Sequence, residues 1–142
     1  MRMLLSALIF LVAAHSARAQ TVADLPPSDR GAIHDAIAGQ MQAFQQNDAA
    51  AAFAFATPNI QGMFGSAENF IAMVQSGYPM VWRPRSVDFG AIVDLDGHIV
   101  QKVEIIGPDG APSLALYTME KGPDGVWRID GCALTASERV AA

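Results

Sequence analysis

The sequence predicts an α+β domain in which a helical half is followed by an antiparallel sheet. In the first half, apolar residues recur every three or four positions from Ile33 onward, which is the period of an amphipathic helix. From Ser86 onward the period falls to two, and short glycine-containing turns separate the apolar segments, which is typical of consecutive antiparallel strands. With 142 residues, the chain has the length of one domain.

The first helix is predicted over residues 29–46, with Ser28 as its N-cap and Asp29 in its first turn. Gly39 lies off the centre of the apolar stripe, where its missing side chain would let another element approach closely. The stripe itself consists of Ile33, Ile37, Met41 and Phe44.

Shorter helices are expected next, divided by residues that begin or end helices. Asn47 and Asp48 form a cap and turn, and the Thr57-Pro58 pair ends the second helix because the residue before proline avoids the helical conformation. Gly65 is the expected stop of the third helix. Ser66 caps the fourth helix, and Gly77 ends it. The predicted ranges are 49–56, 58–64 and 67–76.

Four strands are predicted over residues 86–95, 98–106, 113–121 and 126–134 as an antiparallel meander. In the first, one face is expected to carry Val87, Phe89, Ala91, Val93 and Leu95. The third is apolar on both faces, so both should be covered, one by the helices and the other by a partner subunit or an enclosed cavity. Gly131 interrupts the last strand, and a bulge there would bring Cys132 onto the face of Ile129.

The N-terminus has the three parts of a secretory signal. Arg2 supplies a positive start, and the 11 residues from Leu4 to Ala14 are apolar except for Ser6. Ala17-Arg18-Ala19 places small residues at the cleavage site. The apolar run is too short to span a bilayer, which takes about 20 residues. We therefore expect an exported protein, periplasmic or secreted, with a signal over 1–19, a linker over 20–27, one domain over 28–134 and a C-terminal tail over 135–142.

Charge and cysteine count exclude several classes of function. The chain holds 14 acidic residues against 9 Lys and Arg, and loss of Arg2 and Arg18 with the signal would take the net charge from −5 to −7. Nucleic-acid binding needs a basic surface, so no nucleic-acid partner is expected. A single cysteine, Cys132, excludes an internal disulfide, a Cys-x-x-Cys redox pair and c-type haem attachment. No cofactor is predicted.

The side chains that could carry chemistry are expected to be mainly structural. Asp94 and Asp96 flank a hairpin turn, where carboxylates are solvated. His34 and His98 each lack a second histidine at metal-ligand spacing, so no metal site is predicted. Cys132 is expected in the core, as free cysteines usually are. A catalytic role for His34 and a reactive thiol at Cys132 remain as alternatives.

The densest group of aromatic and basic residues is Tyr78, Trp82, Arg83 and Arg85, in a segment stiffened by two prolines. We predict that these four bind a small anionic or amphipathic ligand. The arginines would hold its carboxylate, and the aromatic rings would form an apolar wall. The alternative is a packed connector with Trp82 buried and both arginines solvated.

A set of short motifs extends over residues 28–134: Phe44, Asn47-Asp48-Ala49, Phe53, Pro58-Asn59-Ile60-Gln61, Phe64-Gly65-Ser66, Phe70-Ile71-Ala72-Met73-Val74, Tyr78-Pro79, Arg83-Pro84-Arg85 and Trp127-Arg128-Ile129-Asp130-Gly131-Cys132. The set resembles the proteobacterial domain-of-unknown-function family 4864. Helices followed by a curved antiparallel sheet are also similar to the cone-shaped fold of the nuclear-transport-factor-2-like and SnoaL-like superfamily. That superfamily includes isomerases, dehydratases, ligand binders and interaction modules, so the resemblance implies a fold without selecting a function.

The favoured function is a non-catalytic module that binds a small molecule or a partner. One alternative is an enzyme of the isomerase or lyase kind that acts in the cone cavity, for which Glu104 and Asp130 are the candidate acids. Another is a structural interaction protein that forms a homodimer through its sheet.

Overall fold

The structure is a computed structural model that describes residues 20–139. The predicted signal over residues 1–19 and the last three residues of the predicted tail lie outside the described residues. The helices are α1 (Pro27–Gln45), α2 (Ala49–Ala54), α3 (Pro58–Phe64), α4 (Ala67–Gly77) and α5 (Pro79–Trp82). The strands are β1 (Thr21–Val22), β2 (Ser86–Leu95), β3 (His98–Ile106), β4 (Pro112–Lys121) and β5 (Trp127–Thr135). The predicted α+β class is confirmed.

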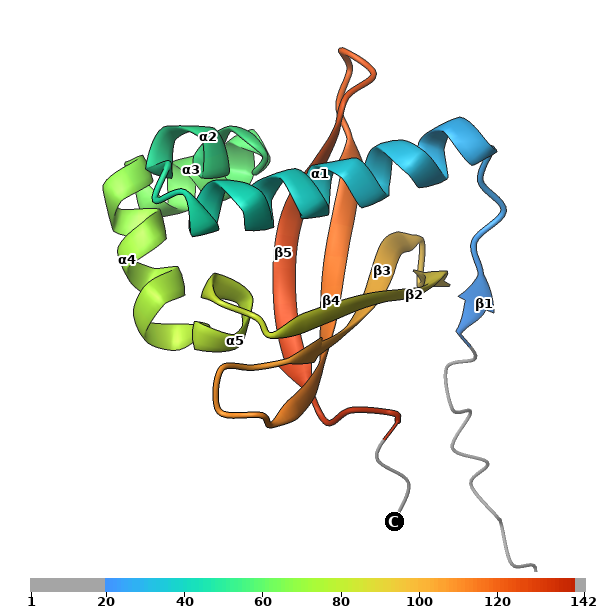
Figure 1. Ribbon diagram of the computed structural model, residues 1–142. Helices are drawn as coiled ribbons and strands as arrows, with labels where there is room; N and C mark the ends of the chain where they lie inside the picture. Colours follow the sequence, from blue (N-terminus) through green and yellow to red (C-terminus); the bar gives the residue numbers. More distant parts are fainter. Residues whose placement is uncertain (1–19, 140–142) are drawn as a thin grey trace, which may run out of the picture.

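The sheet has five antiparallel strands in the order β1-β2-β3-β4-β5 (Figure 1), so the prediction of four strands was wrong. The additional strand, β1, lies in the predicted linker and pairs with the end of β2, where Val22 lies opposite Val93. Two residues are too few to show a period in the sequence. The pairing depends on tertiary contacts, because the Arg30 side chain donates hydrogen bonds to the carbonyl oxygens of Ala23 and Leu25.

Helix α1 begins at Pro27, so the predicted N-cap at Ser28 was wrong. Pro27 suits the first helical position, since its fixed φ is already helical and its missing N–H would have had no partner there. The carbonyl of Pro26 accepts hydrogen bonds from the backbone N–H groups of Asp29 and Arg30 at 3.0 and 3.1 Å. Ser28 therefore lies inside the first turn of the helix.

Gly39 provides the close approach that the sequence predicts. A methyl carbon built on this residue would lie 2.6 Å from Cζ of Phe55, well inside contact distance. The ring of Phe55, just after α2, therefore packs where Gly39 has no side chain. This contact sets the spacing between α1 and the end of α2.

The predicted caps at Asp48 and Ser66 are confirmed, and Thr57, which was predicted only to end the second helix, also caps α3. Asp48, Thr57 and Ser66 each accept a hydrogen bond from the backbone N–H three residues further on, at 3.0 to 3.3 Å. Gly65 follows α3 with a φ of +78°, a conformation that favours glycine. The single turn α5 was not predicted. Pro79 occupies its first position, and the Arg83 N–H closes it on the Pro79 carbonyl at 3.0 Å.

Strand β2 does not keep the single apolar face that the alternation predicts. Its register shifts between Phe89 and Ile92, so Ile92 joins the core beneath the helices while Ala91 is exposed. The bulge frees backbone carbonyls, and the buried Gln101 amide donates hydrogen bonds to those of Gly90 and Lys102 at 2.9 and 2.8 Å. Val93 is thereby turned onto the outer face.

The bulge predicted for β5 is confirmed. Gly131 pairs with Thr118 and Ile129 with Met119, so Asp130 is the extra residue. The Asp130 carboxylate accepts a 2.6 Å hydrogen bond from the hydroxyl of Thr57. Beyond the bulge, Cys132 lies on the same side as Ile129, facing the helices.

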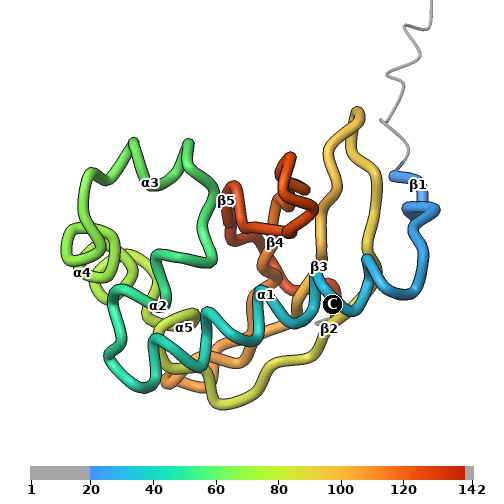
Figure 2. Tube along the Cα trace, turned by 90° about the horizontal axis from the view of Figure 1, so that it is seen from above, coloured from blue at the N-terminus to red at the C-terminus, as the bar shows by residue number. Residues whose placement is uncertain are grey.

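Helix α1 lies across the sheet, and α2, α3 and α4 gather at the end of α1 that is remote from β1 (Figures 1 and 2). The core joins residues of α1 to the inward face of β3 and β4. The link between α2 and α3 also pairs with the edge of β5. There the Ile129 N–H donates to the Phe55 carbonyl and the Thr57 N–H to the Ile129 carbonyl, both at 2.9 Å.

The outer face of the sheet is partly covered by the chain itself. Val93, Val100 and Leu114 are at most 4 % exposed. The part of the predicted tail that the structure describes lies against β3, where Ser137 donates a 2.6 Å hydrogen bond to Glu104. Among the helices of residues 20–139, none is long and apolar enough to cross a membrane.

Candidate functional site

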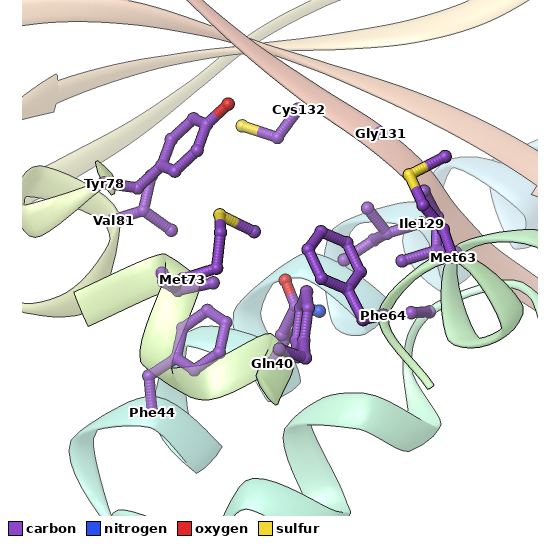
Figure 3. Close-up of a pocket in the computed structure, with 14 residues that line it drawn as sticks. Gln40, Phe44, Met63, Phe64, Met73, Tyr78, Val81, Ile129, Gly131 and Cys132 are labelled. Atoms are coloured by element: carbon purple, nitrogen blue, oxygen red, sulfur yellow. The ribbon is translucent and has the colours of Figure 1, made fainter. Parts of the chain in front are cut away.

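A cavity of about 250 Å³ lies between the helices and β5 (Figure 3). Its walls come from α1, from the helices α3 to α5 and from the bulged part of β5. The apolar side chains that line it are Phe44, Ala56, Ile60, Met63, Phe64, Phe70, Met73, Val74, Val81 and Ile129. Such a lining is typical of sites for small, largely apolar molecules.

Packed aromatic rings make one wall of the cavity stiff. The ring of Phe70 lies with its centroid 6.0 Å from that of Phe44 and 5.5 Å from those of Phe53 and Phe64. Rings at these separations attract one another through their quadrupoles as well as by burial. The wall is therefore held in shape by its own contacts.

The cavity reaches solvent beside α3. Met63 lines it and is 68 % exposed, and Tyr78 on the opposite side is half-buried. In Figure 3 the Tyr78 hydroxyl and the Cys132 sulfur lie at one end of the cavity, and Gln40 lies at the other. The cavity thus has a polar group near each end and an apolar middle.

Gln40 is the buried polar residue of the site, and the sequence analysis missed it. The residue is 4 % exposed, and its Nε2 donates a 3.2 Å hydrogen bond to the carbonyl of Ala52. The amide oxygen points into the cavity (Figure 3). A signal existed in the spacing, since Gln40 lies three residues after Ile37 and four before Phe44, on the apolar stripe itself.

Cys132 faces the cavity as an uncharged thiol. Burial raises its pKa to about 12, so the nucleophilic thiolate is scarce at neutral pH. Directly across the strands, burial also raises the pKa of Tyr117 well above its usual value of 10. The Tyr117 hydroxyl has no hydrogen bond of normal geometry among the described residues. Cys132 thus lines the cavity as an uncharged group, whereas Tyr117 is not among the lining residues.

The structure does not gather the four predicted binding residues at one site. Tyr78 lines the cavity, whereas Trp82, Arg83 and Arg85 are not among the lining residues. Trp82 packs on Phe44, with ring centroids 5.6 Å apart. That these four residues bind an anionic ligand stays a prediction.

Arg83 holds the connector to the end of α1. Its Nη1 donates a 2.7 Å hydrogen bond to the carbonyl of Phe44, and its guanidinium lies 4.6 Å from the ring centre of Trp82. Its Nη2 also lies 3.4 Å from Oδ1 of Asn47. Arg85 is exposed, and its backbone N–H donates to the carbonyl of Ile106 at 2.8 Å. The two arginines therefore have different surroundings.

The other candidates for chemistry lie outside the cavity lining. His34 is exposed and packs on Phe89, with ring centroids 4.2 Å apart. Asp94 accepts a 2.7 Å hydrogen bond from the Gly97 N–H in the hairpin turn. Glu104 points to the outer face, where it binds Ser137. Within residues 20–139, no group of three or more His, Cys, Asp or Glu is placed to hold a metal ion.

In a comparison with protein families, residues 27–142 match the model described as Domain of unknown function (DUF4864). No curated protein matched the chain. No solved structure matched it either.

Proposed function

We propose that this chain, which belongs to the domain-of-unknown-function family DUF4864, is a non-catalytic module that binds a small, mostly apolar molecule in the cavity beside α1. The observation that carries the proposal is the cavity itself, about 250 Å³ in volume and lined by apolar side chains with few polar groups. An apolar cavity of about 150 Å³ can enclose benzene. This cavity therefore suits a molecule of one or two rings, or an amphipathic one whose polar end lies near Tyr78.

The chemistry of the lining supports binding over catalysis. General acid–base catalysis needs a titratable group within hydrogen-bond distance of the substrate. The described residues that line the cavity include no Asp, Glu, His, Lys or Arg. Their titratable side chains are Tyr78 and Cys132, and the Cys132 thiol stays protonated at neutral pH. Glu104 and Asp130, the acids considered for an isomerase or lyase, are also absent from the lining.

We also propose the cone-shaped fold of the nuclear-transport-factor-2-like and SnoaL-like superfamily. The order of the elements, helices before a curved antiparallel sheet, supports it, as do the bulges in β2 and β5 and a cavity under the helices. Export with cleavage after Ala19 is a further proposal. It is supported by the signal pattern of residues 1–19 and by β1, which begins at Thr21, the second residue after the predicted site.

The binding proposal is tested with benzofuran, a neutral molecule of two fused rings. Nuclear magnetic resonance spectra of the protein should show shifts confined to the cavity residues as benzofuran is added. The melting temperature should rise, because a ligand that binds only the folded state stabilises it. If the signals of the cavity residues move neither with millimolar benzofuran nor with its analogues indole and 1-methylindole, the proposal fails.

A matched pair of variants locates the binding. Val81 lines the cavity and is buried, so Val81→Phe adds a ring to the cavity and should abolish the response to benzofuran. Val126 is 47 % exposed in the turn between β4 and β5, so Val126→Phe adds the same ring elsewhere and should leave the response unchanged. Equal responses in the two variants would place the binding outside the cavity.

A further inference from the structure

We infer that Gln40 selects the ligand of this cavity, and that the ligand is a neutral molecule that presents a hydrogen-bond donor to the Gln40 amide oxygen. The inference rests on the proposed function, since it concerns the same cavity. It names the class of molecule that the cavity would hold.

The orientation of the Gln40 amide is fixed by its neighbour. Nε2 donates to the carbonyl of Ala52, a residue of α2 with no exposed surface. A flipped amide would set its oxygen against that carbonyl and would leave a buried acceptor without a donor, which is costly. The oxygen must therefore face the cavity, as Figure 3 shows. Gln40 therefore presents a hydrogen-bond acceptor to the ligand, while its NH₂ group faces the carbonyl of Ala52.

The other polar groups of the cavity do not discriminate strongly between ligands that present a donor and ligands that present an acceptor. The Tyr78 hydroxyl can donate or accept, so it tolerates either kind of partner. The Cys132 thiol is only a weak donor. The Gln40 oxygen is thus the group that discriminates between donors and acceptors on the ligand.

The surroundings of Gln40 also exclude charged ligands. An anion would face the partial negative charge of the amide oxygen, and the described lining offers it no cation. A cation would find no carboxylate there, and a charge buried without a partner is strongly unfavourable. A neutral ring that carries N–H or O–H satisfies both the apolar walls and the acceptor.

Indole and benzofuran test the inference, because they share size and shape but only indole carries an N–H. We expect the protein to bind indole about threefold to tenfold more tightly, the range of one net hydrogen bond. 1-Methylindole, in which a methyl group replaces the donor hydrogen, should lose this advantage. The side-chain amide signals of Gln40 should shift with indole and stay nearly still with benzofuran.

Two variants assign the preference to Gln40. Gln40→Met keeps a long side chain without the acceptor and should bring the affinities for indole and benzofuran to within about twofold of each other. Gln61 is the matched control, because its Nε2 also donates to a backbone carbonyl, that of Phe53 at 3.0 Å, while the residue does not line this cavity. Gln61→Met should keep the preference for indole.

The outcomes separate the two proposals. Equal binding of indole and benzofuran to the unaltered protein would overturn the role of Gln40 and leave the binding function standing. A preference that persists in Gln40→Met would do the same. Failure of all three probes to bind would overturn the binding function and the inference with it. The three-probe comparison needs no variant, so it decides even if Gln40→Met does not fold.

Discussion

Gly39 is a residue at which a missing side chain determines how two elements pack. Alanine there would place a methyl carbon 2.6 Å from Cζ of Phe55, so the ring would have to move. Overpacking of this kind costs about 1–3 kcal/mol, against about 1 kcal/mol gained from the better helix former. We expect Gly39→Ala to lower the free energy of unfolding by up to about 2 kcal/mol, measured by urea denaturation.

The same helix supplies the control for this prediction. Gly31 is exposed, and a methyl carbon there would meet nothing within 4 Å, so Gly31→Ala should stabilise the protein by about 0.5–1 kcal/mol. Phe55→Leu removes the tip of the ring and should cancel most of the cost of Gly39→Ala in the double variant. If Gly39→Ala instead stabilises the protein, the ring of Phe55 can move aside at little cost, and the prediction is wrong.

Cys132 should make stability depend on pH in the alkaline range. Its pKa is raised from about 9 in the unfolded chain to about 12 in the folded one, so the folded state holds the proton more firmly. This contribution is complete below pH 9 and is lost as pH rises from about 9 to about 12. The difference in free energy of unfolding between the natural protein and Cys132→Ala should therefore shrink from pH 8 to pH 11. Parallel pH profiles would contradict the prediction.

At the scale of elements, short-range chemistry was predictable from the sequence. The caps at Asp48, Thr57 and Ser66 and the turn at Asp96 and Gly97 depend on residues next to them in the chain. Thr57-Pro58 and Gly65 likewise act locally. These features follow from the conformations that each residue allows, so no tertiary contact is needed to predict them.

The features that the sequence did not predict depend on distant partners. Strand β1 forms because it pairs with the edge of β2 and because the Arg30 side chain donates a hydrogen bond to the carbonyl of Leu25, just after the strand. The bulge at Gly90 and Ala91 is held by Gln101 from the neighbouring strand. The cavity is similar, since Gln40 becomes a site residue only when Ala52 orients its amide.

Arg83 joins the segment after α5 to the end of α1, and we expect its substitution to lower the stability of the protein. It donates to the Phe44 carbonyl in the last turn of α1, where a positive charge also favours the helix dipole. Because a hydrogen bond from a charged group contributes about 1.5–3 kcal/mol, Arg83→Ala should lower the free energy of unfolding by about that amount. The free energy of unfolding of Arg83→Lys should lie between those of the natural protein and Arg83→Ala, since lysine keeps the positive charge and loses the forked donors of the guanidinium. Thermal and urea denaturation would measure both.

Arg85 is the control for this prediction. It is exposed, so Arg85→Ala should change stability by no more than about 0.5 kcal/mol. If Arg83→Ala leaves stability unchanged but weakens the binding of a carboxylate-bearing ligand, the ligand role first predicted for these arginines would gain support.

At the scale of the whole molecule, the C-terminal residues contribute to the sheet. Ser137 binds Glu104, and Glu138 pairs with Lys102 at 2.9 Å. Such surface contacts contribute about 0–1 kcal/mol each. A chain that ends at Thr135 should therefore melt a few degrees lower than the full chain, as calorimetry would show, and keep its fold. An unchanged melting temperature would mean that these contacts contribute nothing in solution.

The homodimer through the sheet stays a prediction. The outer face that suggested it already buries Val93, Val100 and Leu114 within one chain, while Leu116 is half-buried. Light scattering at micromolar concentration tests the idea, with about twice the mass of one chain as the result expected of a dimer. If the measured mass is that of one chain, the outer face of the sheet is covered within the monomer, by the curvature of the sheet and by the C-terminal residues.

The pairing of the Ala56 segment with the edge of β5 has a consequence for how the wall of the cavity can open. Ile129 and Ala56 both line the cavity, and two backbone hydrogen bonds join their segments. The helical wall cannot swing away from the sheet without breaking both. The amide protons of Thr57 and Ile129 would then exchange with solvent deuterium only when this seam opens. We expect small molecules to enter beside the exposed Met63 through side-chain motion, on a timescale far shorter than that of the exchange at the seam.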